Sequence, residues 1–247
     1  MEILYLLPGD GMPEEELDRR RKTANAIARS DTNVSVMEVG EGPLSIESAI
    51  EHHMAVAPML RRLLEIRKEG KYDAIMIGCA GDPGLEPARE LMDIPVIGPA
   101  ESSYLFACML SDRFSVLSIL RAGEASGDGV RARIREMGLE ARLASVEFVE
   151  DCVTDMWSGG KSDSHEQVAK GVEMARQNGA GSIVLGCMSM AFNLADEAVE
   201  NPPIPIVNPL KTAIKTAETF VDLGLRHSRI TYPAADFGKL MDTVFNQ

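Results

Sequence analysis

Short apolar runs alternate with longer amphipathic stretches along almost the whole chain of 247 residues. The runs are too short for helices and are bounded by turn-forming residues, which is typical of buried strands. The stretches between them repeat apolar residues every three or four positions, which is typical of helices packed on one face. The predicted strands are 3–7, 34–39, 74–77, 95–97, 114–120, 144–148, 182–185 and 204–207. The predicted helices are 14–29, 48–69, 101–110, 128–137, 164–178 and 211–223.

This alternation predicts the fold class. Strands separated by helices of this length form βαβ units, whose strands are parallel and whose sheet is covered on both faces. We therefore expect an α/β protein with parallel sheets.

The pattern also repeats. Residues 72–103, YDAIMIGCAGDPGLEPARELMDIPVIGPAESS, and 179–213, GAGSIVLGCMSMAFNLADEAVENPPIPIVNPLKTA, share one plan. Each has a strand, a Gly-Cys pair, a loop and a helix, followed by IPVIGP in the first copy and IPIVNP in the second. The strands and helices upstream correspond as well. We expect two similar lobes related by a pseudo-twofold axis, residues 1–110 and 111–224, with a tail, 225–247, that packs back on one lobe.

The repeat places two cysteines at equivalent positions. Cys79 and Cys187 each follow a predicted strand, and ligands of such sheets bind beyond the carboxyl ends of the strands. Both thiols are therefore expected at one cleft between the lobes. Nearby backbone amides and a helix N-terminus favour the thiolate and predict a lowered pKa. Two thiols on opposite sides of a ligand can act as an acid/base pair that inverts a carbon centre.

Each cysteine taken alone has a simpler interpretation. A single cysteine after a buried strand is most often an inert small hydrophobe, and it is the matched pair that favours function. Cys108, in an apolar helix, and Cys152, without a counterpart in the other copy, are expected to be structural. His52 and His53 are expected on a helix surface. Asp82 is expected to initiate the turn after Cys79 or to orient that loop.

Composition and charge argue against several classes of function. The formal net charge of −13 argues against a nucleic-acid partner. No apolar stretch is long enough to span a membrane, and the acidic N-terminus is unlike a secretory signal. We expect a cytoplasmic protein with free thiols. No phosphate-binding loop, pyridoxal-phosphate lysine or metal-ligand spacing is present, so no cofactor or metal is predicted.

At these residues the chain resembles the aspartate/glutamate racemase superfamily, and within it the hydantoin and allantoin racemase group. The matching segments are GCAGDPGLEPARE, VLGCMSMA, GPLSIES and LGLRHSRITY, which together span almost the whole chain. The resemblance implies two α/β lobes, cofactor-independent catalysis by two cysteines and a homo-oligomer.

Carried over by position, the resemblance makes Cys79 and Cys187 the acid/base pair. It places the amides of four residues at the substrate oxygens and makes Ser118 a polar contact in the cleft. Those four residues are Ala80, Gly81, Met188 and Ser189.

The first strand of the family is usually followed by an N-P-N-T-type loop that contacts the substrate. Here Pro8 is kept, whereas Leu7 and Gly9 replace the two asparagines and Asp10 adds a carboxylate. Pro8 and Gly9 are still expected to line the site.

We expect a small-molecule substrate, in the first place a 5-substituted hydantoin or allantoin. The alternatives are an aspartate- or glutamate-type racemase, a maleate-type isomerase with one nucleophilic cysteine, and a non-catalytic two-lobed binding protein. An arylmalonate-type decarboxylase is disfavoured because such enzymes keep a single cysteine.

Overall fold

The computed structural model describes residues 1–119, 128–150, 153–154, 156–157, 164–196 and 199–245. Its first half contains β1 (Glu2–Leu7), α1 (Glu14–Ile27), β2 (Asn33–Glu38), α2 (Ala49–Glu69), β3 (Ala74–Ile77), α3 (Leu85–Leu91), β4 (Val96–Ile97) and α4 (Pro99–Leu110). Its second half contains β5 (Phe114–Ile119), α5 (Asp128–Glu136), a 3-10 turn (Glu140–Arg142), β6 (Leu143–Val149), α6 (Ser164–Gln177), β7 (Ser182–Leu185), α7 (Met188–Asp196), β8 (Ile206–Val207) and α8 (Pro209–Asp222). A last helix, α9 (Phe237–Phe245), follows in the tail.

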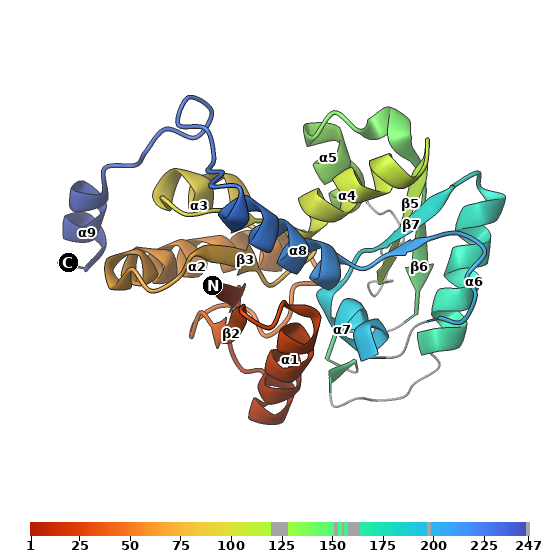
Figure 1. The fold of residues 1–247 in the computed structure, drawn as a ribbon, viewed down its shortest axis with the longest axis horizontal. Helices are drawn as coiled ribbons and strands as arrows, with labels where there is room; N and C mark the ends of the chain where they lie inside the picture. Colours follow the sequence, from red (N-terminus) through yellow and green to blue (C-terminus); the bar gives the residue numbers. More distant parts are fainter. Residues whose placement is uncertain (120–127, 151–152, 155, 158–163, 197–198, 246–247) are drawn as a thin grey trace.

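The strands form two parallel four-stranded sheets of the same order, β2-β1-β3-β4 and β6-β5-β7-β8. Each sheet belongs to one lobe, and the two lobes lie side by side (Figure 1). The predicted α/β architecture of two similar parallel-sheet lobes is confirmed. Leu120, predicted as the last residue of a strand, lies outside the described residues, as does Cys152.

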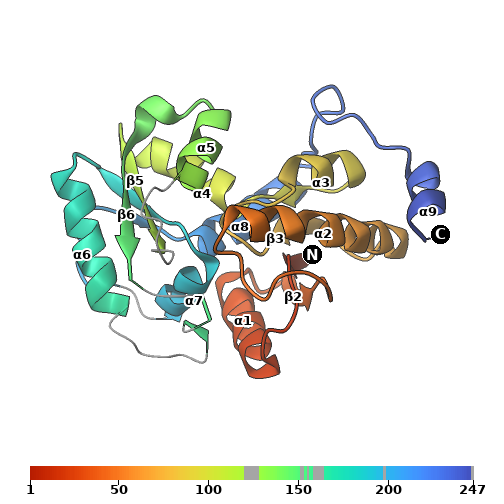
Figure 2. The same ribbon diagram turned by 180° about the vertical axis from the view of Figure 1, so that it is seen from behind.

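The two halves of the chain exchange one helix each. Although α4 follows β4, its Tyr104 stacks on Phe114 of β5 with ring centroids 5.6 Å apart, and it belongs to the buried cluster of the second sheet. In return, α8 packs on β3 and β4 of the first sheet. The two helices touch each other where the Ser103 and Thr212 hydroxyls lie 2.8 Å apart. Each lobe is therefore covered by a helix from the other half of the chain (Figures 1 and 2).

Both exchanged helices begin earlier than the sequence predicts. The expected starts are residues 101 and 211, whereas the helices begin at Pro99 and Pro209. Proline suits the first helical position because its φ is already helical and its missing N–H would have no partner there.

The tail runs along the first lobe. Nε2 of His227 accepts a hydrogen bond of 2.9 Å from the Val96 amide of the edge strand β4. Burial, together with the nearby Arg89, lowers the pKa of His227 to about 4, so the ring is a neutral acceptor at physiological pH. Further along, the Arg67 guanidinium lies 4.8 Å from the Phe237 ring centroid, which joins α9 to α2.

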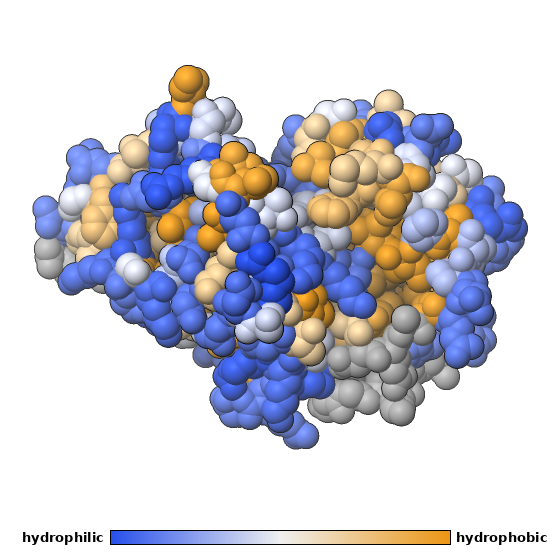
Figure 3. Space-filling model, viewed as in Figure 1, coloured by the Kyte–Doolittle hydropathy of each residue, from blue (hydrophilic) through white to orange (hydrophobic). Residues whose placement is uncertain are grey.

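One face of the second lobe stays apolar at the surface. Figure 3 shows apolar side chains gathered beside α8. The large exposed apolar side chains of α4 are Leu105, Phe106, Met109 and Leu110. No helix in the described part of the chain is long and apolar enough to cross a membrane.

Candidate active site

At the two Gly-Cys pairs the backbone leaves each sheet in the same way. The Gly78 amide donates to the Leu6 carbonyl at 2.7 Å, and the Gly186 amide donates to the Leu117 carbonyl, also at 2.7 Å. A Cβ atom would lie 2.8 Å from the Leu6 oxygen at Gly78 and 3.0 Å from the Leu117 oxygen at Gly186. Only glycine fits without displacing the backbone of the central strand, and each cysteine therefore emerges just beyond the sheet.

Both cysteines line one cavity of about 600 Å³, a volume typical of small-molecule sites. The structure brings all nine residues that the sequence predicts for the site to this cavity: Pro8, Gly9, Cys79, Ala80, Gly81, Ser118, Cys187, Met188 and Ser189. Three of the cysteines, Cys79, Cys108 and Cys187, are not joined in disulfide bonds.

The loop after Cys79 is long and tightly folded. The Gly81 amide points at the Cys79 sulfur, with N and Sγ 3.4 Å apart. The Asp82 amide donates to the Cys79 carbonyl at 3.1 Å, and Asp82 itself has a φ of +50°, in the left-handed region. The thiol thus lies above a compact turn of backbone amides.

Cys187 is placed differently because α7 begins at the next residue. The amides of Ser189 and Met190 donate to Cys187 and favour its thiolate, as does the charge of Arg20. Burial acts in the opposite direction and is the largest influence, so the pKa of Cys187 is raised above its ordinary value. The sequence pattern predicts a lowered pKa, and for Cys187 that prediction is wrong because burial outweighs the amides.

Asp82 joins the Cys79 loop to α4. Its carboxylate accepts hydrogen bonds from the Ala100 amide at 2.9 Å and the Glu101 amide at 2.8 Å, which caps the N-terminus of α4. Gly98 leaves room for this carboxylate, since a Cβ there would lie 2.4 Å from Oδ2. Burial raises the pKa of Asp82 to about 6, against the opposing effect of Arg133 and the two amides.

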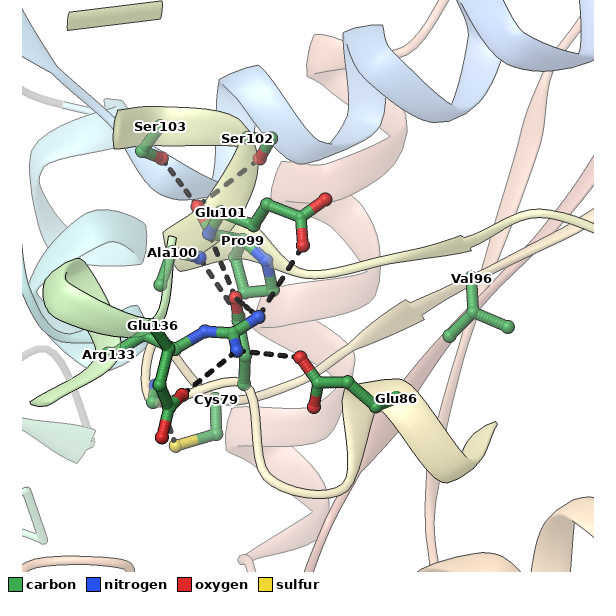
Figure 4. Close-up of polar contacts among 12 residues, drawn as sticks. Cys79, Glu86, Val96, Pro99, Ala100, Glu101, Ser102, Ser103, Arg133 and Glu136 are labelled. Carbon is green, nitrogen blue, oxygen red and sulfur yellow. Dashed lines mark hydrogen bonds and ion pairs between the residues drawn. The ribbon is translucent and has the colours of Figure 1, made fainter. Parts of the chain in front are cut away.

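Arg133 lies on α5 of the other lobe and points toward Glu86 and Glu101 (Figure 4). Its guanidinium lies 2.7 Å from Glu86, 3.4 Å from Glu101 and 3.8 Å from Asp82. Those three carboxylates hold the pKa of Arg133 above its ordinary value despite burial. The wall beside Cys79 is therefore an ion-pair network that joins the two lobes.

The loop after β1 explains one departure from the family pattern. A Cβ atom at Gly9 would lie 2.2 Å from the Pro43 carbonyl oxygen. The 43–49 segment thus packs directly on the Gly9 backbone and lines the same cavity. An asparagine side chain has no room at this position.

Several cavity residues are not predicted from the sequence. Of the two adjacent histidines, His53 is exposed as expected, whereas His52 is half-buried, and both line the cavity. Gly81 lets His52 approach, because a Cβ there would lie 3.3 Å from its Nδ1. Arg20 and Trp157 also line the cavity. Trp157 could be suspected as the only tryptophan of the chain, but Arg20 has no distinguishing signal in the sequence.

The charge of the cavity is mainly negative. Among the described residues that line it, the two arginines, Arg20 and Arg133, are both in ion pairs. The carboxyl-bearing residues that line it are Asp10, Glu38, Glu47, Asp82, Glu86 and Glu136. Within the described chain, no three His, Cys, Asp or Glu side chains converge as metal ligands would.

The chain is similar to known proteins along most of its length. The family model of the Asp/Glu/hydantoin racemases matches residues 15–217. A hydantoin racemase of Pseudomonas sp. (strain NS671) is 34% identical over 215 residues, which cover 84% of this chain and 81% of that protein. A hydantoin racemase of Paenarthrobacter aurescens is 30% identical over 211 residues, covering 83% and 86%.

Among solved structures, the allantoin racemase from Klebsiella pneumoniae superposes with a TM-score of 0.84 at 26% identity. The superposition covers 96% of this chain and 94% of that one. The similarity thus extends over both lobes and over both Gly-Cys loops. The chain belongs to the Asp/Glu/hydantoin racemase family, and its enzyme class is that of the racemases.

Proposed function

We propose that this protein racemises a 5-substituted hydantoin or allantoin by a two-base mechanism in which Cys79 and Cys187 are the catalytic residues. The observation that carries the proposal is the pair of equivalent Gly-Cys steps that deliver both thiols to one cavity. The relatives named as hydantoin and allantoin racemases support the substrate class.

The reaction needs only proton transfers. One cysteine, as thiolate, removes the proton from the ring carbon next to a carbonyl, and the electron pair of the broken C–H bond moves into that carbonyl. The other cysteine, as thiol, then donates its proton to the opposite face, which inverts the centre. The ring carbonyl carries the negative charge in between. No electron is gained or lost overall, so this mechanism uses no cofactor.

The backbone supplies the groups that bind the substrate oxygens. The amides of Gly81 and Ser189 donate to the cysteines. Ala80 and Met188 line the same cavity, and we therefore assign their amides to the ring oxygens.

Cavity charge favours a substrate without carboxylates. Aspartate and glutamate bring two carboxylates, which would be repelled by the acidic lining of the cavity. Both cavity arginines already face carboxylates of the protein. A hydantoin ring presents carbonyl and N–H groups instead. This difference favours the hydantoin-type substrate over the amino-acid racemase alternative.

Hydrogen exchange in deuterated water tests the proposal. Each enantiomer of a 5-substituted hydantoin, and of allantoin, should gain deuterium at the stereocentre in the presence of the protein, above the rate without protein. Free aspartate and glutamate, and the isomerisation of maleate, serve as comparison reactions. If no hydantoin exchanges while aspartate does, the substrate assignment is wrong. If ligand binding raises the melting temperature and nothing exchanges, the protein is a binding protein.

Single cysteine variants test the mechanism. Cys79→Ser and Cys187→Ser should each reduce racemisation by at least about a hundredfold, because loss of one proton-transfer group costs about 10²–10⁴-fold. Cys108→Ser is the matched control: Cys108 is a half-buried cysteine of α4, and this variant should keep full activity. Full activity in either cavity variant would refute the two-base mechanism. A covalent adduct on one cysteine would instead indicate the maleate-type reaction.

We also propose that the protein is a homo-oligomer. The apolar side chains that α4 leaves exposed support this, because large apolar patches of soluble proteins commonly mark protein–protein contacts. Light scattering coupled to gel filtration measures the mass directly. A mass of one chain at micromolar concentration would refute the proposal.

A further inference from the structure

A buried arginine lies between the two Gly-Cys loops. Arg20 of α1 is 2% exposed, and its guanidinium donates three hydrogen bonds in three directions. Nε donates to Glu16 at 2.8 Å, Nη1 to the Tyr5 hydroxyl at 3.2 Å, and Nη2 to the Ser189 hydroxyl at 2.8 Å. This arrangement connects residues of both lobes directly beneath the cavity.

The Tyr5 branch leads to Cys79. The Tyr5 hydroxyl, which accepts from Arg20, donates to the Gly78 carbonyl at 3.1 Å, and Gly78 immediately precedes Cys79. Burial raises the pKa of Tyr5 to about 12, so the hydroxyl keeps its proton and remains a donor at neutral pH. The orientation of the peptide group before Cys79 therefore depends on Tyr5, and that of Tyr5 depends on Arg20.

The Ser189 branch leads to Cys187. The Ser189 hydroxyl accepts from Arg20 and lies 3.3 Å from the Trp157 Nε1 donor, so it is held from two sides. The amide of the same residue donates to Cys187. The positive charge of Arg20 also favours the Cys187 thiolate, against burial and the negative charge of Glu47. Arg20 thus acts on this thiol both through Ser189 and through its charge.

The surroundings keep this guanidinium in place. Glu16 balances its charge, and the hydrogen bonds from Arg19 and Arg20 hold the pKa of Glu16 below its ordinary value although burial alone would raise it. The Phe192 ring lies under the guanidinium, with the ring centroid 4.8 Å from Cζ. A planar guanidinium can hold three partners at fixed angles, whereas a lysine ammonium is a point charge without that geometry.

We propose that Arg20 is a positioning residue for both cysteines, holding the Cys79 loop through Tyr5 and the Cys187 loop through Ser189, and that its positive charge also acts on Cys187. The inference rests on the proposed two-cysteine function. It can nevertheless be tested on the resting protein without any substrate.

The test uses three variants in the full-length protein. Arg20→Gln removes the charge and most of the N–H donors of the guanidinium, whereas Arg20→Lys keeps the charge but loses the planar arrangement of donors. Arg19→Gln is the matched control, because Arg19 is the neighbouring residue, also pairs with Glu16 and donates to Asn193, and it is not among the residues that line the cavity. Glu16 stays paired with Arg19 in both Arg20 variants, so no buried carboxylate loses all its partners.

The readout is the pH dependence of alkylation of Cys187 by iodoacetamide, followed by peptide mass spectrometry, which separates Cys187 from the other cysteines. We expect the midpoint to move up by about one pH unit in Arg20→Gln, the lower end of what an adjacent charge produces. Arg20→Lys should keep the midpoint near that of the unmodified protein, and Arg19→Gln should not move it.

Hydrogen exchange then separates positioning from charge. Both Arg20 variants should lose at least about tenfold in kcat for exchange, since neither holds both loops, while Arg19→Gln keeps its rate. An unchanged Cys187 midpoint in a folded Arg20→Gln variant would overturn the charge role, and unchanged kcat in Arg20→Lys would overturn the positioning role. If the unmodified protein exchanges no substrate, the proposed function fails, and the alkylation result still decides how Arg20 acts on Cys187.

Discussion

Replacing Asp82 with asparagine should change how the stability of this protein depends on pH. The side chain is buried at the junction of the Cys79 loop, α4 and Arg133, and its carboxylate accepts two backbone hydrogen bonds. Asparagine has nearly the same shape but cannot ionise. The comparison therefore isolates the cost of carrying a charge at this position.

The magnitude follows from the shift in pKa. Burial raises the pKa of Asp82 from 3.8 to about 6, a difference of about 2 pH units. At 1.36 kcal/mol per unit, ionisation of Asp82 costs the folded state roughly 3 kcal/mol relative to the unfolded state. Because the pKa of Asp82 is raised on folding, protonated Asp82 contributes this free energy to the stability of the folded state. The contribution is fully present below pH 3.8 and is lost as the pH rises through 6. Between pH 4.5 and 7.5 the loss amounts to about 2 kcal/mol.

Asparagine also carries a constant cost. Only one of its two terminal atoms accepts a hydrogen bond, so one of the amides of α4 loses its partner, at about 1–3 kcal/mol. This cost is the same at both pH values and cancels in the comparison. Asp82→Asn should thus be less stable than the unmodified protein at pH 4.5 and should recover about 2 kcal/mol relative to it at pH 7.5.

Urea denaturation at the two pH values, followed by the fluorescence of Trp157, measures the difference. Glu86→Gln is the control, because Glu86 pairs with the same Arg133 but has a lowered pKa. Its contribution has the opposite sign, so Glu86→Gln should lose stability relative to the unmodified protein as the pH rises. A difference between Asp82→Asn and the unmodified protein that stays constant within about 0.5 kcal/mol would refute the reasoning.

Two further changes test the loop after β1 and the anchor of the tail. Gly9→Ala places a Cβ 2.2 Å from the Pro43 oxygen, so the 43–49 segment must shift, and we expect a loss of about 1–3 kcal/mol in thermal unfolding and a raised KM. His227→Phe removes the acceptor of the Val96 amide and should cost about 1–3 kcal/mol at pH 7. Because folding lowers the pKa of His227 from 6.5 to about 4, its contribution is present above pH 6.5 and is lost as the pH falls through 4. The stability deficit of His227→Phe should therefore shrink in acid.

The sequence predicts the architecture and the position of both cysteines because these features are local and duplicated. A Gly-Cys pair after an apolar run indicates a strand end, and the carboxyl ends of parallel strands meet at one edge. Two copies of the same pattern then indicate two loops at one cleft. None of this requires knowledge of which helix covers which sheet.

The sequence does not predict the polar interior of the site. Glu16 and Arg20 lie four residues apart on a strongly charged helix, a spacing that usually indicates a solvent-exposed ion pair. They are buried because α1 also packs on α7 and α8 of the other half of the chain. The hydrophobic pattern does not predict the exchange of α4 and α8 between the lobes either. It shows that each helix has an apolar face but not which sheet that face covers.

The difference between IPVIGP and IPIVNP shows how the two copies diverged. In the second copy Asn208 caps α8 itself, accepting from the Leu210 amide at 3.0 Å. In the first copy Gly98 occupies the equivalent position, and the Asp82 carboxylate from the Cys79 loop enters the space and caps α4 instead. The first cysteine loop is thereby tied to the helix that covers the second sheet, whereas Cys187 directly precedes its own helix.

This divergence bears on the chemistry. A two-base racemase needs one thiolate and one thiol at the same moment. Two coupled thiols lose their protons in two separate steps, but the coupling alone does not decide which sulfur keeps its proton. Cys187 has the amides of a helix N-terminus and a buried guanidinium, whereas Cys79 lies on a loop held by a buried carboxylate whose pKa is about 6. Gene duplication can supply two equivalent thiols, but only unequal surroundings can assign the proton to one of them. The unlike caps, together with the different ion-pair partners of Arg20 and Arg133, make the surroundings of the two thiols unequal.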